Sequence, residues 1–222
     1  MTALMLGIDT ATALTTVALT EPDVTSGTLR VLAEREHRDP RRHGEVLPVL
    51  IDALLSQASR TPRELTAIAV GVGPGAYTGL RVGIATAQAM AATLQIPAFG
   101  VVTLDAIAFA TARTESFAIV TDARRSELFA ARYGDYRSRE AQPWVAAPDA
   151  VVSQLNGIAV FAPAGTPKLP GADYQACAEV SATDVCRVVV DRQRRGEPLE
   201  PVRPMYLRRP DVSTASAPKS VL

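Results

Sequence analysis

The 222-residue chain lacks several features that define whole classes of proteins. It has only two cysteines, Cys177 and Cys186, which are too far apart for a C-x-x-C motif, so a reducing compartment is expected rather than a disulfide scaffold. It has no apolar run near the length of a membrane span, and its first residues, MTALMLGIDTAT, lack the basic region of a signal peptide. These absences predict a cytoplasmic protein with no membrane contact.

An excess of charge and a metal-binding histidine pair are absent too. Basic and acidic residues number 23 each, so bulk electrostatics favour neither nucleic acid nor a membrane surface as a partner. The only histidines, His37 and His43, are six residues apart, which excludes the i, i+4 pair of an H-E-x-x-H motif. We expect solvated or capping roles for both, and we predict no metal site.

What the sequence does contain is a glycine-rich stretch, GVGPGAYTGLRVGIATAQAM, over 71–90. It is not a P-loop, because Leu80 and Arg81 follow Gly79 where Lys and Ser or Thr are required, and it lacks the third glycine of a dinucleotide fingerprint. A strand that enters a helix through such a turn still presents free N–H groups and a helix dipole to an anion. One hypothesis is therefore a vestigial phosphate or anion site made of Asp9, Gly73, Gly75 and Thr78.

Small residues also share one face of the helix predicted over 78–94. Gly79, Gly83, Ala87 and Ala91 follow one another at four-residue intervals. Glycine inside a helix costs about 1 kcal/mol relative to alanine, so another backbone should approach this face closely. That backbone belongs either to the chain's own sheet or to a partner. The partner interpretation adds the amphipathic helix over 45–57 and gives an interface of Leu47, Leu50, Leu54, Gly79, Gly83 and Ala87.

The rest of the chain alternates apolar strands and amphipathic helices. The segments LGID-TATAL-TTVAL and IVTD-ARRSE-LFAAR both consist of an apolar strand, an aspartate, a short turn and a returning strand, which predicts two related halves. We place them at 1–103 and 104–210 and expect the tail 211–222 to be disordered. Two local expectations are that Pro48 lies in the first turn of its helix and that the capping box 61–64 starts another.

Five segments, in order along the chain, closely resemble the TsaB (YeaZ) family: MLGIDTAT, HGEVLP, GVGPGAYTGLRVGIATAQAMA, DARRSELF and PMYLRRPD. The resemblance implies an α/β protein with a duplicated ASKHA fold (that of actin, sugar kinases and Hsp70), made of two small α/β subdomains with a degenerate second half. It also implies a non-catalytic subunit that pairs with a TsaD-like paralogue and a TsaE-like ATPase for threonylcarbamoylation of tRNA adenosine 37. Such a subunit would meet tRNA indirectly, through the complex, and could form a homodimer when alone.

The resemblance also indicates why this chain should not be the catalyst. Where the TsaD-like paralogue carries a metal-binding histidine pair, this chain has Thr103 and Ile107, which are poor metal ligands. Where an active ATPase would have glycines in its second phosphate loop, this chain has the side chains of Asp122-Ala123-Arg124-Arg125. We therefore expect no cofactor and no catalytic residue.

Other functions stay open beside this one. A nucleotide-binding ASKHA ATPase or phosphotransferase is supported by Asp9 and the glycine loop. A metallopeptidase is the weakest alternative, because the chain has neither H-E-x-x-H nor a Ser/His/Asp arrangement. Direct contacts between RNA and the arginines from Arg187 to Arg209 are a minor expectation, since a solvated helix face explains those arginines equally well.

Overall fold

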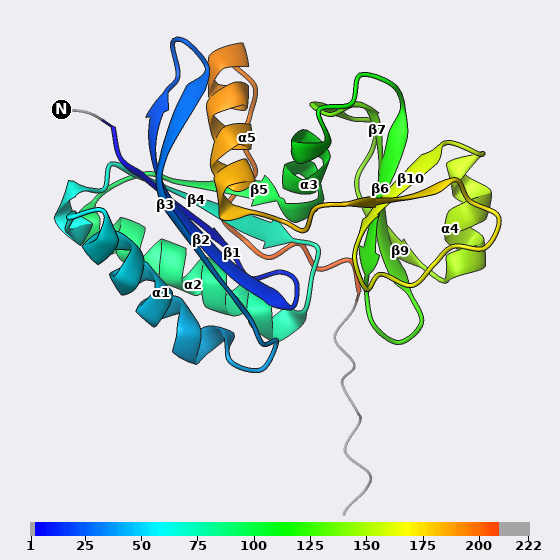
Figure 1. Ribbon diagram of the computed structural model, residues 1–222, viewed down its shortest axis with the longest axis horizontal. Helices are drawn as coiled ribbons and strands as arrows, with labels where there is room; N and C mark the ends of the chain where they lie inside the picture. The colour runs from blue at the N-terminus through cyan, green and yellow to red at the C-terminus, as the bar shows by residue number, and fades with distance from the viewer. Residues whose placement is uncertain (1–2, 209–222) are drawn as a thin grey trace, which may run out of the picture.

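The computed structural model describes residues 3–208 and contains two mixed β-sheets (Figure 1). In the first sheet β1, β2 and β3 are antiparallel neighbours, and β4 and β5 continue parallel to β1 on its other side. Its strands are β1 (Met5–Asp9), β2 (Leu14–Asp23), β3 (Thr28–Arg38), β4 (Ala67–Gly73) and β5 (Ala98–Val102). The tail predicted to be disordered, 211–222, lies outside the described residues.

The second sheet repeats the strand order and directions of the first. Strands β6, β7, β8, β10 and β11 take the places of β1, β2, β3, β4 and β5, and β9 pairs with β7 as an addition. The strands are β6 (Phe117–Asp122), β7 (Leu128–Asp135), β8 (Ser138–Arg139), β9 (Trp144–Ala146), β10 (Ala159–Pro163) and β11 (Tyr174–Cys177). The predicted repeat is thus confirmed as a duplicated topology. A boundary at residue 103 stays a prediction.

The helices show where the second half is degenerate. Helix α1 (His43–Gln57) precedes β4, and α4 (Pro148–Leu155) precedes β10 in the same way. Helix α2 (Tyr77–Leu94) joins β4 to β5, whereas the matching segment 164–173, all of it described, contains no helix. Each half then closes with a helix, α3 (Thr103–Thr111) after β5 and α5 (Ala182–Arg195) after β11.

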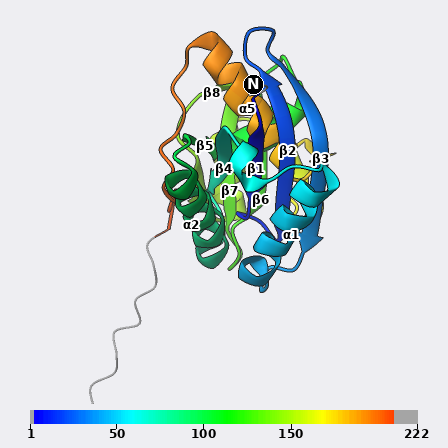
Figure 2. The same cartoon turned by 90° about the vertical axis from the view of Figure 1, so that its left-hand side faces the viewer.

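Helices and sheets stack in alternating layers (Figures 1 and 2). Helices α1 and α2 cover one face of the first sheet, α3 and α5 lie between the two sheets, and α4 covers the far face of the second sheet. Apolar residues from both sheets and from α3 and α5 form one shared central cluster, which includes Val101, Ile107, Phe117, Phe129 and Val189. No helix within residues 3–208 combines the length and hydropathy needed to cross a bilayer.

One local expectation was wrong and the other was confirmed, although the confirmed one starts only a short turn. Helix α1 begins at His43, so Pro48 lies in its second turn. Because proline has no backbone N–H, the carbonyl of Gly44 has no helical hydrogen-bond donor, and both residues are exposed to solvent. The box at Thr61–Glu64 starts only a single 3₁₀ turn, Pro62–Glu64. The Glu64 carboxylate does accept the Thr61 N–H at 2.7 Å. The turn stops there because Leu65 has extended backbone angles and leads directly into β4.

Candidate functional site

A cleft of about 720 Å³ lies where the two halves meet. Loops from both halves line it, together with the end of the described chain, and its volume is in the range typical of ligand pockets. The first half contributes the β1–β2 turn and the start of α2, and the second contributes the β6–β7 turn and the segment after β10. The lining segments are 11–13, 74–77, 121–125, 163–166 and 206–208.

Each half contributes a turn with a matching aspartate to this region. Asp9 ends β1 and accepts the N–H of Ala11 at 2.8 Å, two residues on; Asp122 ends β6 and accepts the N–H of Arg124 at 2.7 Å, also two residues on. The duplication therefore extends to side-chain hydrogen bonds. The two turns differ in exposure, because Asp122 lines the cleft and Asp9 does not.

Asp9 is completely buried. Its second carboxylate oxygen accepts the hydroxyl of Thr103 at 2.8 Å, and a side chain at Gly71 would collide with it. Burial raises the pKa of Asp9 to about 6, although its hydrogen bonds with Ala11 and Thr103 lower it. With both oxygens engaged inside the protein, Asp9 serves as the closing residue of a turn, and no solvent-facing oxygen is left for a ligand in the cleft.

The structure does not bring the four predicted anion-site residues together. Only Gly75 lines the cleft; Gly73 is buried behind it with Asp9, and Thr78 is exposed on α2 outside the lining. A side chain at Gly75 would collide with the carbonyl oxygen of Ala11. The glycine loop is therefore used for close packing of α2 onto the β1–β2 turn.

The positions expected to replace a metal-binding pair are both in the core. Thr103 and Ile107 are each about 1% exposed, at the start and middle of α3. The Thr103 hydroxyl also accepts the N–H of Gly73 at 3.3 Å, so it ties α3 to the glycine loop. Among residues 3–208 no three His, Cys, Asp or Glu side chains are grouped closely enough to hold a metal ion.

His43 has neither of the expected roles. It is the first residue of α1 and only 3% exposed, and its Nδ1 lies 2.7 Å from the hydroxyl of Thr15. Burial lowers its pKa, because the charged imidazolium is disfavoured away from water. His43 is therefore a packing residue between α1, β2 and the first turn of α2.

The second phosphate-loop position is occupied by a strained arginine turn. Arg124, Arg125 and Ser126 all have positive φ, between 55° and 63°, a region that non-glycine residues avoid. Arg124 pairs with Asp122 at 3.1 Å, and across the cleft Arg38 pairs with Glu179 at 2.6 Å. Both pairs lie on the cleft wall, so two of its basic side chains already have carboxylate partners.

The small-residue face of α2 packs against the chain's own first sheet. Side chains at Gly79 and Gly83 would collide with the carbonyl and the hydroxyl of Thr10, which follows β1, and the Thr10 hydroxyl donates to the Gly79 carbonyl at 2.7 Å. Five of the six predicted interface residues are buried inside the chain, namely Leu47, Leu54, Gly79, Gly83 and Ala87. These five residues are used for packing within the chain, and only Leu50 stays partly exposed; the interface itself stays a prediction.

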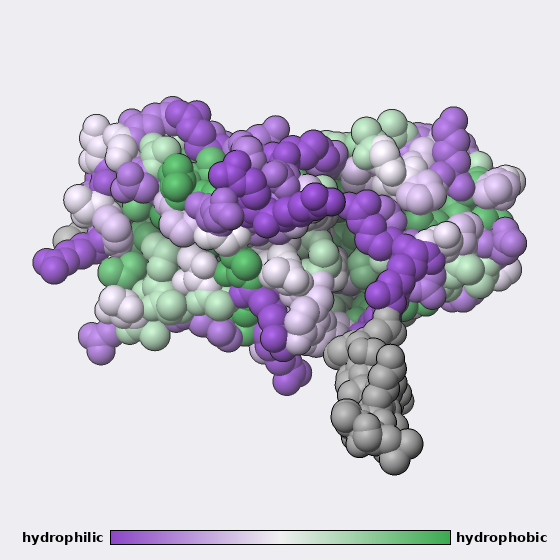
Figure 3. Space-filling view, turned by 90° about the horizontal axis from the view of Figure 1, so that it is seen from below, coloured by the Kyte–Doolittle hydropathy of each residue, from purple (hydrophilic) through white to green (hydrophobic). Residues whose placement is uncertain are grey.

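The outer face of the same two helices is nevertheless unusual. Arg81 is the single charged residue in the 18 residues of α2, and Val49 of α1 is 65% exposed. Seen from below, the surface on the side of α1 and α2 carries broad pale and green areas between hydrophilic margins (Figure 3). We call this set of exposed or half-exposed side chains the helical face: Val46, Val49, Leu50 and Ala53 of α1, and Val82, Ala85, Ala89 and Met90 of α2.

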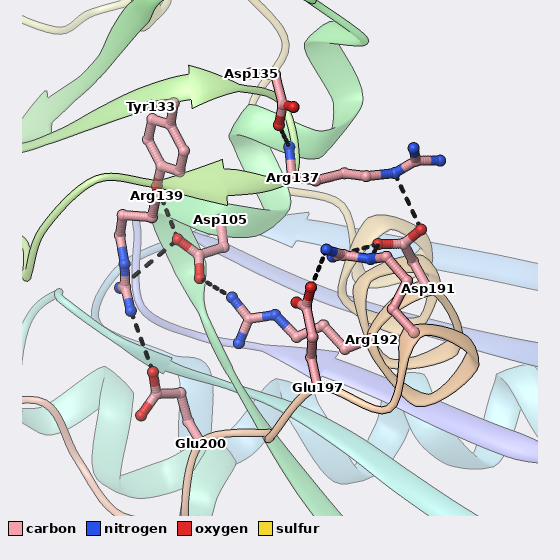
Figure 4. A network of polar contacts seen from close by, with 10 residues as sticks. Asp105, Tyr133, Asp135, Arg137, Arg139, Asp191, Arg192, Glu197 and Glu200 are labelled. Atoms are coloured by element: carbon pink, nitrogen blue, oxygen red, sulfur yellow. Dashed lines mark hydrogen bonds and ion pairs between the residues drawn. The ribbon is translucent and has the colours of Figure 1, made fainter.

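A buried ionic network joins α3, the helix that closes the first half, to the second half (Figure 4). Asp105 of α3 accepts hydrogen bonds from the Tyr133 hydroxyl at 2.9 Å and from the Arg192 guanidinium at 2.7 Å. A guanidinium nitrogen of Arg139 lies 3.6 Å from the same carboxylate. Arg139 in turn pairs with Glu200 at 3.2 Å. The network thus links α3, β7, β8, α5 and the segment after α5. Sequence periodicity gave no sign of it, because its members are up to 95 residues apart in sequence (200 against 105).

A duplicated α/β unit with a cleft where its halves meet defines a two-subdomain protein of the ASKHA class, the fold that the resemblance to the TsaB family implied. The model of the family described as TsaD, tRNA N6-adenosine threonylcarbamoyltransferase, matches residues 30–183. The chain belongs to this family, and within it to the TsaB (YeaZ) branch.

Individual relatives agree with this placement. An uncharacterised protein of Mycobacterium tuberculosis is 38% identical over 212 residues, which cover 93% of this chain and 92% of the relative. The tRNA threonylcarbamoyladenosine biosynthesis protein TsaB of Escherichia coli is 36% identical over 132 residues, 58% of this chain and 54% of that protein. The solved structure of YeaZ from Pseudomonas aeruginosa superimposes with a TM-score of 0.75 at 28% identity, over 92% of this chain and 100% of that one.

Proposed function

We propose that the protein is a non-catalytic subunit in the biosynthesis of threonylcarbamoyladenosine in tRNA, and that it acts by binding a TsaD-like paralogue. Similarity to the TsaB proteins of Escherichia coli and Bacillus subtilis supports the pathway. A TsaE-like ATPase completes the proposed assembly, which meets adenosine 37 of tRNA through the TsaD-like subunit.

The observation that carries the proposed partner role is the helical face. Monomeric proteins seldom expose contiguous apolar patches without an interaction to cover them. Here the exposed side of α2 is uncharged apart from Arg81, and Val49 projects from the neighbouring helix. The opposite sides of both helices are already used by the chain's own core, so this outer face is what they offer to a partner.

The sequestered Asp9 supports the non-catalytic part of the proposal. A nucleotide-hydrolysing enzyme needs a carboxylate that can reach a metal-bound phosphate, whereas Asp9 is 0% exposed with both oxygens hydrogen-bonded internally. Its second-half counterpart, Asp122, is held by Arg124. The cleft therefore favours the subunit role over the ATPase or phosphotransferase alternative.

The test is a binding and activity assay with the TsaD-like protein of the same organism. We expect the purified chain to form a stable complex in size-exclusion chromatography and to restore threonylcarbamoylation of tRNA in the reconstituted system. Val49→Asp, on the helical face, should abolish both without changing the melting temperature. Val31→Asp is the matched control, because Val31 is 40% exposed on edge strand β3, away from that face. Equal behaviour of the two variants would refute the helical face as the contact surface.

A further inference from the structure

The end of the described chain returns to the first half as a strap. We use this name for residues 197–208, which follow α5. Glu200 forms an antiparallel bridge with Gly100 on the edge strand β5, and the N–H of Met205 donates to the carbonyl of Val72 at 2.8 Å. Gln88 of α2 donates from its side chain to the carbonyl of Val202 at 2.7 Å. The strap is thus bonded along its length to the first sheet and to α2.

This course places a strap tyrosine on the first turn of α2. The rings of Tyr206 and Tyr77 stack with centroids 5.1 Å apart and an interplanar angle of 24°. The guanidinium carbon of Arg81 lies 4.1 Å from the centroid of the Tyr77 ring, and its Nε donates to the Tyr206 hydroxyl at 2.9 Å. Three side chains from segments 125 residues apart therefore hold one another in place.

This cluster is exposed although it is well ordered by its own contacts. Tyr77 is 44% and Tyr206 40% exposed, and they are two of the few large apolar side chains that the described chain leaves open to solvent. Tyr and Arg are the residue types most enriched at the energetic centres of protein interfaces, and side chains that are already fixed lose little entropy when a partner binds. The cluster therefore has the composition and the preorganisation of an interface anchor.

The cluster is also continuous with the helical face. Tyr77, Arg81, Ala85, Ala89 and Ala92 are all exposed and follow one another at intervals of three or four residues, so they form one stripe along α2. A surface that binds RNA would need several free cations, whereas Arg81 is the only charge on this helix. The stripe favours a protein partner over a nucleic acid.

We propose that Tyr206, Tyr77 and Arg81 form the anchor of the contact with the TsaD-like partner, and that the partner presents an apolar surface with a carboxylate opposite Arg81. This inference rests on the function proposed above and adds the strap to its interface. The described residues give no hydrogen-bond or ion-pair partner to the two terminal nitrogens of Arg81, so its guanidinium can make a charge-assisted pair with that carboxylate.

The test is the dissociation constant of the full chain with the TsaD-like protein, measured by titration calorimetry beside the melting temperature. We expect Tyr206→Ala to weaken binding by at least about 30-fold, as is usual for an interface anchor, and Arg81→Gln by about 10-fold. The double variant should lose less affinity than the product of the two single-variant fold-changes, because the two side chains support each other. Tyr206→Phe, which keeps the ring, should fold normally and lose only a few-fold, and Arg63→Gln is the exposed arginine control.

The outcomes separate this inference from the function beneath it. If Val49→Asp abolishes binding but Tyr206→Ala and Arg81→Gln bind as the unaltered chain does, the anchor is refuted and the subunit role stands. If the unaltered chain does not bind the TsaD-like protein at all, both fall. If Tyr206→Ala leaves that binding unchanged but weakens binding of a tRNA anticodon stem-loop by the complex, the cluster is an RNA contact and the inference is also overturned.

Discussion

At the scale of single residues, Asp9 shows how burial commits a carboxylate to a structural role. It ends β1, Gly71 and Thr103 enclose it, and its carboxylate closes the β1–β2 turn. Its counterpart Asp122 makes the same turn in the open, on the cleft wall. The two aspartates differ in burial. Burial raises the pKa of Asp9, and the effect of this shift on stability can be measured.

We predict that Asp9→Asn removes a pH dependence of stability. The pKa of Asp9 is about 6 in the folded chain against 3.8 for the free group, so the folded state holds an extra proton between these values. Because the folded state then binds more protons than the unfolded state, the free energy of unfolding falls as the pH rises through this interval. The full effect of a shift of this size is roughly 3 kcal/mol.

Urea unfolding of both chains at about pH 4 and about pH 7 checks this expectation. The free energy of unfolding of Asp9→Asn minus that of the unaltered chain should be larger at the higher pH than at the lower one. Asp52→Asn, which removes an exposed carboxylate from α1, is the control. The same difference at both pH values would show that Asp9 does not titrate as its burial implies.

At the scale of elements, α2 has two faces with different uses. The face with Gly79 and Gly83 lies on Thr10 and the first sheet, and the face with Ala85 and Ala89 is open. The spacing of small residues correctly predicted a close approach of backbone to this helix. It could not decide which backbone, because a small side chain permits contact with the chain's own sheet and with a partner equally well.

Substitutions on the two faces of α2 should therefore differ in their effect on stability. Gly83→Leu would drive a side chain into the Thr10 hydroxyl and Ile8, so we expect a loss of stability of at least about 1–3 kcal/mol, with partner binding lost only as a consequence. Ala85→Leu, two residues further on, is the matched variant on the open face and should keep its melting temperature. Thermal unfolding followed by circular dichroism checks both; a normally stable Gly83→Leu chain would contradict the packing described here.

The elements that the sequence predicted well are those defined by local pattern. The strands β1, β4 and β6 and the long helix after the glycine loop appear within a residue or two of the expected positions, whereas β2 runs four residues beyond the predicted TTVAL segment. The strap and the Asp105 network were not foreseen, since both depend on pairs such as Tyr77–Tyr206 and Asp105–Arg192 that have no periodic signal. Pro48 was misplaced because the start of α1 is set by the burial of His43 rather than by a capping residue.

At the scale of the whole molecule, the two halves are held together by more than the chain that joins them. The central apolar cluster draws on both sheets, and the Asp105 network crosses the same junction. Glu200 extends that network into the strap, whose farther end carries the Tyr206 cluster. The Asp105 carboxylate is therefore one of the groups that hold the halves together, and through Arg139 and Glu200 it contributes to the seating of the strap.

Asp105→Asn should show how much that carboxylate contributes. Asp105 is 5% exposed and faces Arg192 and Arg139, so its neutralisation leaves the largely buried Arg192 guanidinium without its countercharge and leaves Arg139 with Glu200 alone. Breaking a buried ion pair by removing one partner typically costs about 3–5 kcal/mol, whereas an exposed pair contributes about 0–1 kcal/mol. Glu45→Gln, which breaks the exposed pair with Arg42, is the control and should change the free energy of unfolding little.

Hydrogen exchange would show where the effect of Asp105→Asn is felt. We expect faster exchange in the strap, at the N–H groups of Glu200 and Met205, before exchange rises in the first sheet, because the strap is tied to the network through Glu200. Partner binding should weaken with it, since Tyr206 would lose its fixed position on Tyr77. If the variant unfolds at the same denaturant concentration as the unaltered chain, or if its strap exchanges no faster, the network does not support the strap.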